Sequence, residues 1–237
     1  MTRAGVLEAA IDVFGTHGFE GTSTRALAQR AGTNLTAIRY HFGSKEGLYL
    51  AAAERIASGV RQRLHGSLDR VRAIAGSPRA TREELIDAIA AILDTIVSQV
   101  AGGAPDPWFK FIAREQLDPT HAFDVLFGAI EPVIEMLSML IGRVLGRRAR
   151  GQDVRLLTMM LTGQVSVFRS QRSAALRALG WSGFGAAETR NLRAAVRTNT
   201  VMLLNALADR NDRPRRSARG AASGGEAPAK RVRAHVC

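Results

Sequence analysis

The segment that most constrains the fold lies near the N-terminus and reads TSTRALAQRAGTNLTAIRYHFGSK. Ser23 or Thr24 can cap a first helix there, because a hydroxyl accepts a hydrogen bond from a free amide at a helix start. Gly32 can end that helix, since glycine adopts a left-handed backbone at little cost. Thr33 or Asn34 can cap the second helix. Two short helices around a glycine turn form the helix-turn-helix pattern, although two packed helices of any all-α protein would have the same spacing.

Apolar residues recur at helical spacing on both sides of this segment. Before it, a stripe that includes Leu7 and Phe14 predicts a helix over about 2–17. After it, apolar residues at every fourth position predict a long helix from Ser44 to about Gly66. Further helices are expected over about 81–100, 108–116, 120–145 with a kink or restart at Pro132, 153–179 and 186–209.

The chain divides into three predicted parts, and its fold class is all-α. An N-terminal three-helix DNA-binding domain is expected at 1–47, with its helix-turn-helix at about 23–42, and a larger helical ligand-binding and dimerisation domain at 48–210. From 211 to 237 the composition turns to Arg, Gly, Ser, Ala and Pro, which cannot bury enough apolar surface to fold. This disordered basic tail either adds non-specific affinity for DNA phosphates or only keeps the protein soluble.

The positive charge of the chain is unevenly placed. The net charge is +12, which favours an anionic partner. Residues 1–47 hold five basic and four acidic side chains, whereas the tail holds seven and two. The charge argument for DNA therefore depends on where the basic side chains lie and on the tail, not on the total of the proposed DNA-binding head.

Cysteine content and the lack of long uncharged apolar runs favour a cytoplasmic location. Cys237, the last residue, is the sole cysteine, which excludes a disulfide framework and suits a reducing compartment. Glu8 and Asp12 interrupt the apolar N-terminus, so no signal peptide is expected. No stretch approaches about 18 uncharged apolar residues, and no membrane span is predicted.

Three ordered segments within residues 7–49 resemble the TetR family of transcriptional regulators. They read LEAAIDVFGTHGFEGTS, TSTRALAQRAG and IRYHFGSKEGLY. The resemblance implies a regulator that places the start of its second motif helix in the DNA major groove. It also implies that the last two long helices pack against their copies as a four-helix homodimer interface. Periodicity alone leaves open a core helix pair within a monomer.

Candidate DNA contacts divide into side chains that read bases and side chains that bind phosphates. Residues at the start of the second motif helix are short or neutral, so that end of the helix can approach the groove floor. Arg25, at the start of the first motif helix, suits contact with a guanine edge or a phosphate. The candidates for base contact are Arg25, Thr33, Asn34, Leu35, Thr36 and Ala37. The candidates for phosphate contact are Arg39, Tyr40, His41 and Lys45. Tyr40, His41 and Lys45 match the family motif, whereas Arg39 stands where the family often has an aromatic residue.

A second resemblance covers most of residues 108–181. The pattern REQLxPTxAF and the later GQVSVFRSQRSAALRALGW resemble the C-terminal domain of the CerR/CecR-like subgroup of TetR regulators. Polar residues lie among aromatic ones there, as a small-molecule pocket requires. The candidate ligand-binding residues are Trp108, Phe111, Arg114, Glu115, His121, Phe127, Gln164 and Phe168. The same residues also fit a plain core with a structural ion pair between Arg114 and Glu115.

No catalytic motif is found in the sequence. The GxSxG, HExxH, P-loop and dinucleotide-binding patterns are missing, so neither an enzyme nor a cofactor is predicted. Glu115, Asp118, His121 and Asp124 are close in sequence, but Pro119 breaks their helical spacing, and no metal site is expected.

The resulting hypothesis is a cytoplasmic, homodimeric repressor that binds a partly palindromic double-stranded DNA operator upstream of efflux or xenobiotic-response genes. An apolar or amphipathic small-molecule effector is expected to bind within 80–180 and to favour a conformation whose two heads no longer match the operator. A helical small-molecule-binding protein without operator specificity is the alternative from another class.

Overall fold

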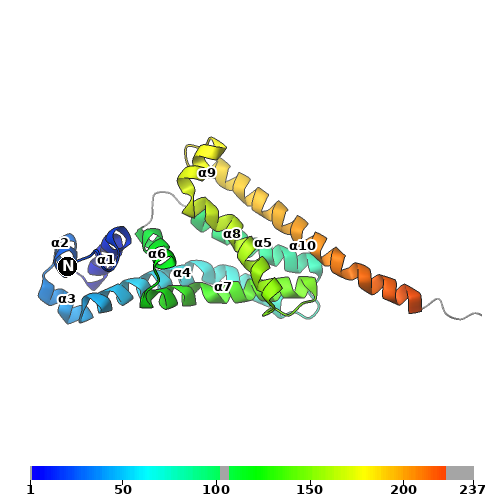
Figure 1. Ribbon diagram of the computed structural model, residues 1–237, viewed down its shortest axis with the longest axis horizontal. Coiled ribbons are helices and arrows are strands. Elements are labelled where there is room, and N and C mark those ends of the chain that lie inside the picture. Colours follow the sequence, from blue (N-terminus) through cyan, green and yellow to red (C-terminus); the bar gives the residue numbers. More distant parts are fainter. Residues whose placement is uncertain (1, 102–106, 223–237) are drawn as a thin grey trace, which may run out of the picture.

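The computed structural model describes residues 2–101 and 107–222, and within them every regular element is a helix, which confirms the predicted all-α fold (Figure 1). The helices are α1 (Arg3–His17), α2 (Thr24–Arg30), α3 (Leu35–Phe42), α4 (Lys45–Gly76), α5 (Arg82–Ala101), α6 (Pro107–Leu117), α7 (His121–Leu145), α8 (Gln152–Ser170), α9 (Arg172–Leu179) and α10 (Ala186–Ala222).

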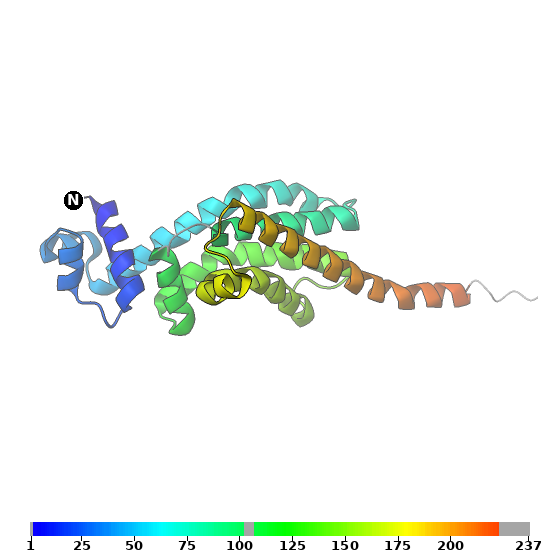
Figure 2. The ribbon, with the colours of Figure 1, turned by 90° about the horizontal axis from the view of Figure 1, so that it is seen from above.

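The first three helices and the start of α4 form a small head at one end of an elongated molecule (Figures 1 and 2). Phe14, Leu27 and Ile38 come from α1, α2 and α3 and are buried in one apolar cluster. Tyr49 of α4 meets the ring of Phe14 edge-on at 4.7 Å between centroids. The apolar stripe that predicts α1 is therefore the face of α1 that packs in the core of the head.

Helix α4 connects the head to the rest of the molecule and runs ten residues beyond its predicted end at Gly66. Glycine inside a helix costs about 1 kcal/mol relative to alanine, which made Gly66 look like a terminus. The apolar stripe continues past it, however, through buried Leu68, Val71 and Ala75. Burial of these side chains against the body outweighs the local preference of one exposed glycine.

The body joins the second half of α4 to α5, α7, α8 and α10 in one apolar core, with Ile89, Leu137 and Leu161 among its buried side chains. α7 is long and apolar enough to cross a membrane by length and composition alone. Here its buried apolar residues lie in the protein interior, Leu140 in the body core and Leu126 in the apolar cluster of the head. The helix also continues through exposed Pro132 without the restart that the sequence suggests.

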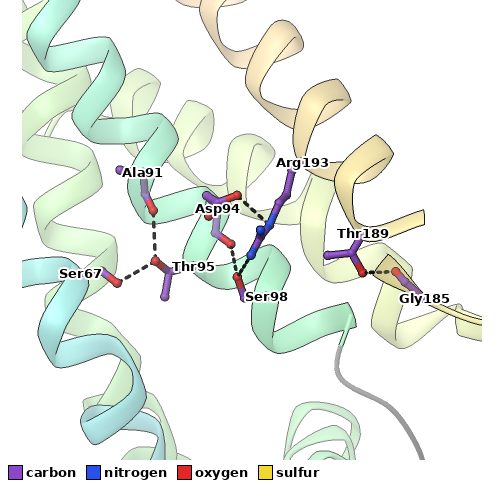
Figure 3. Close-up of polar contacts among 8 residues, drawn as sticks. All are labelled: Ser67, Ala91, Asp94, Thr95, Ser98, Gly185, Thr189 and Arg193. Atoms are coloured by element: carbon purple, nitrogen blue, oxygen red, sulfur yellow. Dashed lines mark hydrogen bonds and ion pairs between the residues drawn. The ribbon is translucent and has the colours of Figure 1, made fainter. Parts of the chain in front are cut away.

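Figure 3 shows how polar contacts hold α5 between two neighbours. On one side, the hydroxyls of Ser67 and Thr95 lie 2.7 Å apart and join α4 to α5. On the other, Arg193 of α10 lies 3.0 Å from a carboxylate oxygen of Asp94 and donates to the hydroxyl of Ser98 at 2.6 Å. α5 is thus fixed to both α4 and α10.

One prediction for the C-terminal third needs correction. The helix predicted over 153–179 breaks into α8 and α9 at Gln171, whose φ of −114° and ψ of 36° lie outside the helical region. α10 extends to Ala222, into the predicted tail of 211–237, and the disorder of that tail stays a prediction. The remainder of the predicted tail, 223–237, lies outside the described residues, as does most of the stretch between the helices predicted over 81–100 and 108–116.

Candidate nucleic-acid interface

The turn between α2 and α3 is built by the predicted capping residues. The Ser23 hydroxyl accepts from the amide of Ala26 at 3.1 Å, and the Asn34 side-chain oxygen accepts from the amide of Ala37 at 2.8 Å. Gly32 has a φ of 58°, in the left-handed region that glycine adopts without strain. Asn34 is therefore the cap of α3, and its side-chain oxygen already accepts a hydrogen bond from the protein in the absence of DNA.

The outer side of α3 carries the predicted contact residues and keeps them in solvent. Tyr40 is 84% exposed, and its ring lies 5.1 Å from that of His41. Arg25 and Arg39 are exposed and make no side-chain hydrogen bond or ion pair within the described residues. Leu35 is 42% exposed at the first position of the helix. Thr36 is also exposed, whereas Thr33 and Ala37 are half-buried beside it.

Lys45 is held differently from the other predicted phosphate contacts. Its ammonium donates to the carbonyl oxygens of Phe19 at 3.0 Å and Thr22 at 3.2 Å, and lies 4.1 Å from the centre of the Phe19 ring. An ammonium has three protons, so one donor remains for a phosphate. In this structure Lys45 joins the start of α4 to the α1–α2 loop.

Among the residues predicted to bind a ligand, those of α6 pack against the head instead. Phe111 is 1% exposed and stacks on Tyr49 at 4.6 Å between ring centroids. The Arg114 guanidinium donates to the carbonyl oxygens of Gly15, at 3.0 Å, and Thr16, near the end of α1. The structural ion pair between Arg114 and Glu115 that the sequence allowed is not formed.

The buried carboxylate of Glu115 has its own partners. It accepts from the Tyr49 hydroxyl at 2.5 Å and from the Thr120 amide and hydroxyl at 3.0 and 3.1 Å. Burial is the main cause that raises the pKa of the Tyr49 hydroxyl above its usual range, and the hydrogen bond and charge of Glu115 raise it further. Glu115 thus ties the α6–α7 turn to the start of α4.

Trp108 completes the contact between α6 and the long helix α4. Its indole lies over Gly59, where a Cβ atom would come within 2.3 Å of the ring. The guanidinium groups of Arg55 and Arg63 lie 5.1 and 4.7 Å from the ring centre. Figure 1 shows α6 beside α1 on one side and α4 on the other. α6 therefore packs between the head and the body.

The other predicted ligand residues lie in separate places, so the eight do not line one pocket. His121 is exposed at the start of α7, and Phe127 stacks on Phe123 at 5.9 Å near the surface. Gln164 of α8 bonds to Thr200 of α10 at 3.2 Å. Phe168 meets Phe184 at 6.5 Å beside α9. A cleft of about 440 Å³ between head and body includes His121 and is lined by Phe19, Glu20, Glu46, Tyr49, Leu50, Pro119, Thr120 and His121.

Tyr49 and Gly59 are the residues of this junction that sequence reasoning missed. Both sit on α4 at positions that read as ordinary helix, and their partners in α6 are far along the chain. The one sequence signal was the glycine in the middle of an apolar helix, which often marks a close approach. No group of three or more His, Cys, Asp or Glu side chains suited to a metal occurs in the part of the chain that the structure describes.

The capped α2–α3 turn and the exposed outer side of α3 define a helix-turn-helix DNA-binding protein. Residues 6–52 match the model of bacterial regulatory proteins of the tetR family, and residues 81–207 match that of the C-terminal domain of the HTH-type transcriptional dual regulator CecR. This chain belongs to the TetR family of transcription regulators and carries a CecR-type C-terminal domain.

Known relatives agree with that assignment. The HTH-type transcriptional dual regulator CecR of Shigella flexneri is 30% identical over 207 residues, which cover 87% of this chain and 92% of the relative. The HTH-type transcriptional regulatory protein RaaS of Mycobacterium tuberculosis is 46% identical over 59 residues, 25% of this chain and 27% of the relative.

Solved structures share the fold at lower identity. A putative transcriptional regulator from Pseudomonas aeruginosa PAO1 superposes with a TM-score of 0.62 at 14% identity, covering 87% of this chain and 92% of that one. FadR from Bacillus subtilis, solved with stearoyl-CoA, gives a TM-score of 0.56 at 16% identity, covering 84% and 98%.

Proposed function

We propose that this regulator is a homodimeric repressor that an effector releases from its operator. The observation that carries the DNA-binding part is the outer side of α2 and α3. Arg25 and Arg39 are exposed there without a side-chain hydrogen bond or ion pair among the described residues, and Tyr40 is 84% exposed. Each α3 would enter one major-groove half-site, and the two half-sites would lie about 34–36 Å apart or a multiple of that.

Two outward sides of the body support the homodimer. On α8, Leu156, Met159 and Met160 are between 56% and 62% exposed, although the opposite side of the same helix is buried in the core. Met202 of α10 is 66% exposed. Apolar side chains that recur on one outward helix face favour a protein partner. A second copy would cover both helices at once, as the family resemblance implies.

The oligomeric state can be tested at one position. Met160→Glu places a charge within the proposed interface and is expected to give a particle of about the chain mass, 25.5 kDa, where the unchanged protein gives about twice that. Leu117→Glu is the matched control, because Leu117 is 87% exposed on α6, outside the proposed interface. Light scattering at matched concentration measures both. Equal masses for the unchanged protein and Met160→Glu would rule out this interface.

The position of α6 supports release by an effector. Phe111 and Arg114 fix α6 to the head, while the chain before it leads from α5, which Ser67 and Arg193 contacts hold within the body. A ligand that moves α5 or α6 by a small amount would therefore tilt the head. It need only prefer one conformation by a few kcal/mol, about 5.5 for a nearly complete switch.

We place the effector in the body, between α7, α8 and α10. Ser138 and Thr158 form a buried hydroxyl pair at 2.9 Å, and Gln164 bonds to buried Thr200. These are polar groups set among apolar side chains such as Met139, so an amphipathic ligand could exchange its own hydrogen bonds for theirs. Efflux or xenobiotic-response genes are the proposed targets.

Binding to the DNA upstream of the protein's own gene tests the DNA-binding part of the proposal. The unchanged protein should shift that fragment at salt near 0.1 M, and Arg39→Ala with Tyr40→Ala should abolish the shift without lowering the melting temperature. Arg61→Ala, which removes a surface arginine paired with Glu54, should leave binding unchanged. A shift that survives the double change would contradict the assigned DNA face.

The direction of control needs a separate measurement, because the Shigella flexneri relative is named a dual regulator. Transcription of the neighbouring genes should rise when this protein is deleted if it represses, and fall if it activates. A helical ligand-binding protein without operator specificity would instead show no selective shift of the upstream fragment over unrelated DNA.

A further inference from the structure

Unpaired arginines gather at the end of the body that is farthest from the head. They come from the α4–α5 turn, the α7–α8 turn, the first turn of α8 and α10. We name them the distal arginine cluster; its members are Arg79, Arg148, Arg150, Arg155 and Arg210. All five are exposed, and none has a side-chain hydrogen bond or ion pair among residues 2–101 and 107–211.

Contacts between neighbouring groups bring these segments to one place. Arg143 of α7 donates to the carbonyl oxygens of Ala75 at 2.7 Å and Ser77 at 2.6 Å, which sets the α4–α5 turn beside α7. Arg147 donates to Asn211 at 3.1 Å, which sets the α7–α8 turn beside α10. The cluster therefore surrounds one end of the helical body.

The cluster is remote from the proposed operator contacts. α4 begins at the head and ends where Arg143 meets the α4–α5 turn, and its 32 residues span about 48 Å at 1.5 Å per residue. Figures 1 and 2 both show α10 leaving the body at the end opposite to α3. A duplex lying on α3 therefore cannot reach these arginines without strong bending, since duplex DNA is stiff over this length.

Three of the carboxylates at this end are already used, whereas Glu83 of α5 is exposed without a side-chain hydrogen bond or ion pair among the described residues. Asp153 pairs with Arg147, Asp209 pairs with Arg82 at 2.7 Å, and Glu84 accepts from Thr81 in a helix cap. Elsewhere on the surface, Arg61 and Arg197 have carboxylate partners, while Arg177 and Arg190 stand alone and do not form a group of five. The distal end thus has an excess of positive charge that the protein itself does not neutralise.

The chain beyond this end adds to the same excess. Residues 211–237 contain seven basic and two acidic side chains, and they follow directly from the α10 segment that carries Arg210. Guanidinium groups on several separate elements suit a polymer of phosphates better than one small anion, because each can neutralise a different phosphate.

We propose that the distal arginine cluster is a second, sequence-independent site for the phosphates of duplex DNA, so that one dimer can hold an operator and a separate DNA segment together. The site reads no bases, and its affinity falls with salt. It would work whether or not the protein represses, since it does not use α3.

The first experiment isolates the distal site in a background that lacks the head contacts. Arg39→Ala with Tyr40→Ala is combined with Arg148→Ala, Arg150→Ala and Arg155→Ala, and affinity for an unrelated 20-base-pair duplex is measured at several salt concentrations. The distal changes should weaken binding at least tenfold and lower the slope of log affinity against log salt by up to about 0.9 per lost phosphate contact. Arg61→Ala, Arg72→Ala and Arg197→Ala remove the same charge from paired positions and should leave affinity within twofold.

The second experiment measures bridging. The full-length protein is bound to an immobilised upstream fragment, and retention of a labelled unrelated duplex is recorded. Retention should be lost with the distal changes and kept with the paired-arginine control, while binding to the immobilised fragment stays unchanged. Equal retention or equal affinity for distal variant and control overturns the proposal, as does retention of single-stranded RNA but not of duplex DNA. If the upstream fragment is not bound at all, the repressor proposal fails and the first experiment still decides this one.

Discussion

The Tyr49 hydroxyl lies 2.5 Å from a carboxylate oxygen of Glu115 and joins the start of α4 to α6. Both side chains are buried, at 4% and 1% exposure. Since Thr120 supplies the other donors to this carboxylate, three elements meet in one hydrogen-bonded group. A movement of α6 can therefore reach the head through this group as well as through the contacts of Arg114 with α1.

Removing the Tyr49 hydroxyl should therefore destabilise the junction. Tyr49→Phe leaves the ring in place but takes one donor from a buried carboxylate, which should lower the free energy of unfolding by about 1–3 kcal/mol. Chemical denaturation at pH 7 measures the loss. Tyr40→Phe is the control, because the Tyr40 side chain is 84% exposed, and it should change stability by less than about 0.5 kcal/mol. Equal stabilities for the two variants would show that the Glu115 contact contributes nothing.

The same hydroxyl predicts a pH dependence. Burial and then Glu115 raise the pKa of Tyr49 in the folded protein, whereas a tyrosine in an unfolded chain titrates at about 10. A group whose pKa is raised by folding stabilises the protein below its unfolded pKa, and this contribution is lost as the pH rises above it. The unfolding free energy should thus fall more steeply above pH 10 for the unchanged protein than for Tyr49→Phe. Parallel curves over that range would contradict the assignment.

Local signals in the sequence predicted the helices and their caps well. Ser23, Asn34 and Ser44 each accept the backbone amide that a cap requires, because capping depends only on residues within one turn. Thr81 and Glu84 also cap locally at the start of the helix predicted over 81–100, through the reciprocal bonds of a capping box. These features do not depend on the rest of the fold.

The ligand residues were harder to place, because their partners are distant in sequence. Arg114 and Glu115 are adjacent, and adjacent side chains on a helix point in different directions, so each meets a different element. Arg114 reaches α1 and Glu115 reaches α4. Nothing in the pattern around them says that the head covers this side of α6, which only the tertiary packing decides.

The fit of Trp108 over Gly59 predicts that one added methyl group can disturb the packing of α6 on α4. Gly59→Ala would place a Cβ atom within 2.3 Å of the indole, and such overpacking costs about 1–3 kcal/mol. The helix preference for alanine offsets about 1 kcal/mol of that. The variant should be less stable and should bind the upstream fragment more weakly, because α6 is displaced from α4.

A second change separates this clash from any other effect of the alanine. Trp108→Leu in the Gly59→Ala protein makes room for the methyl group, so the double variant should recover part of the lost stability. The coupling energy between the two positions, measured by a double-mutant cycle of denaturation curves, should be at least about 0.5 kcal/mol. If the two substitutions change the unfolding free energy additively within error, the methyl group does not clash with the indole.

Asn34 caps α3 through its side-chain oxygen, and this predicts that folding and DNA binding separate at that position. Asn34→Asp keeps an oxygen that accepts the Ala37 amide, so stability should change little, whereas Asn34→Ala should cost about 1 kcal/mol. The aspartate, however, brings a negative charge to the helix end that faces the DNA phosphates, so operator affinity should fall at least tenfold. Melting curves and fluorescence anisotropy with the upstream fragment measure the two properties. If Asn34→Asp binds as tightly as the unchanged protein, the amino end of α3 does not lie against DNA.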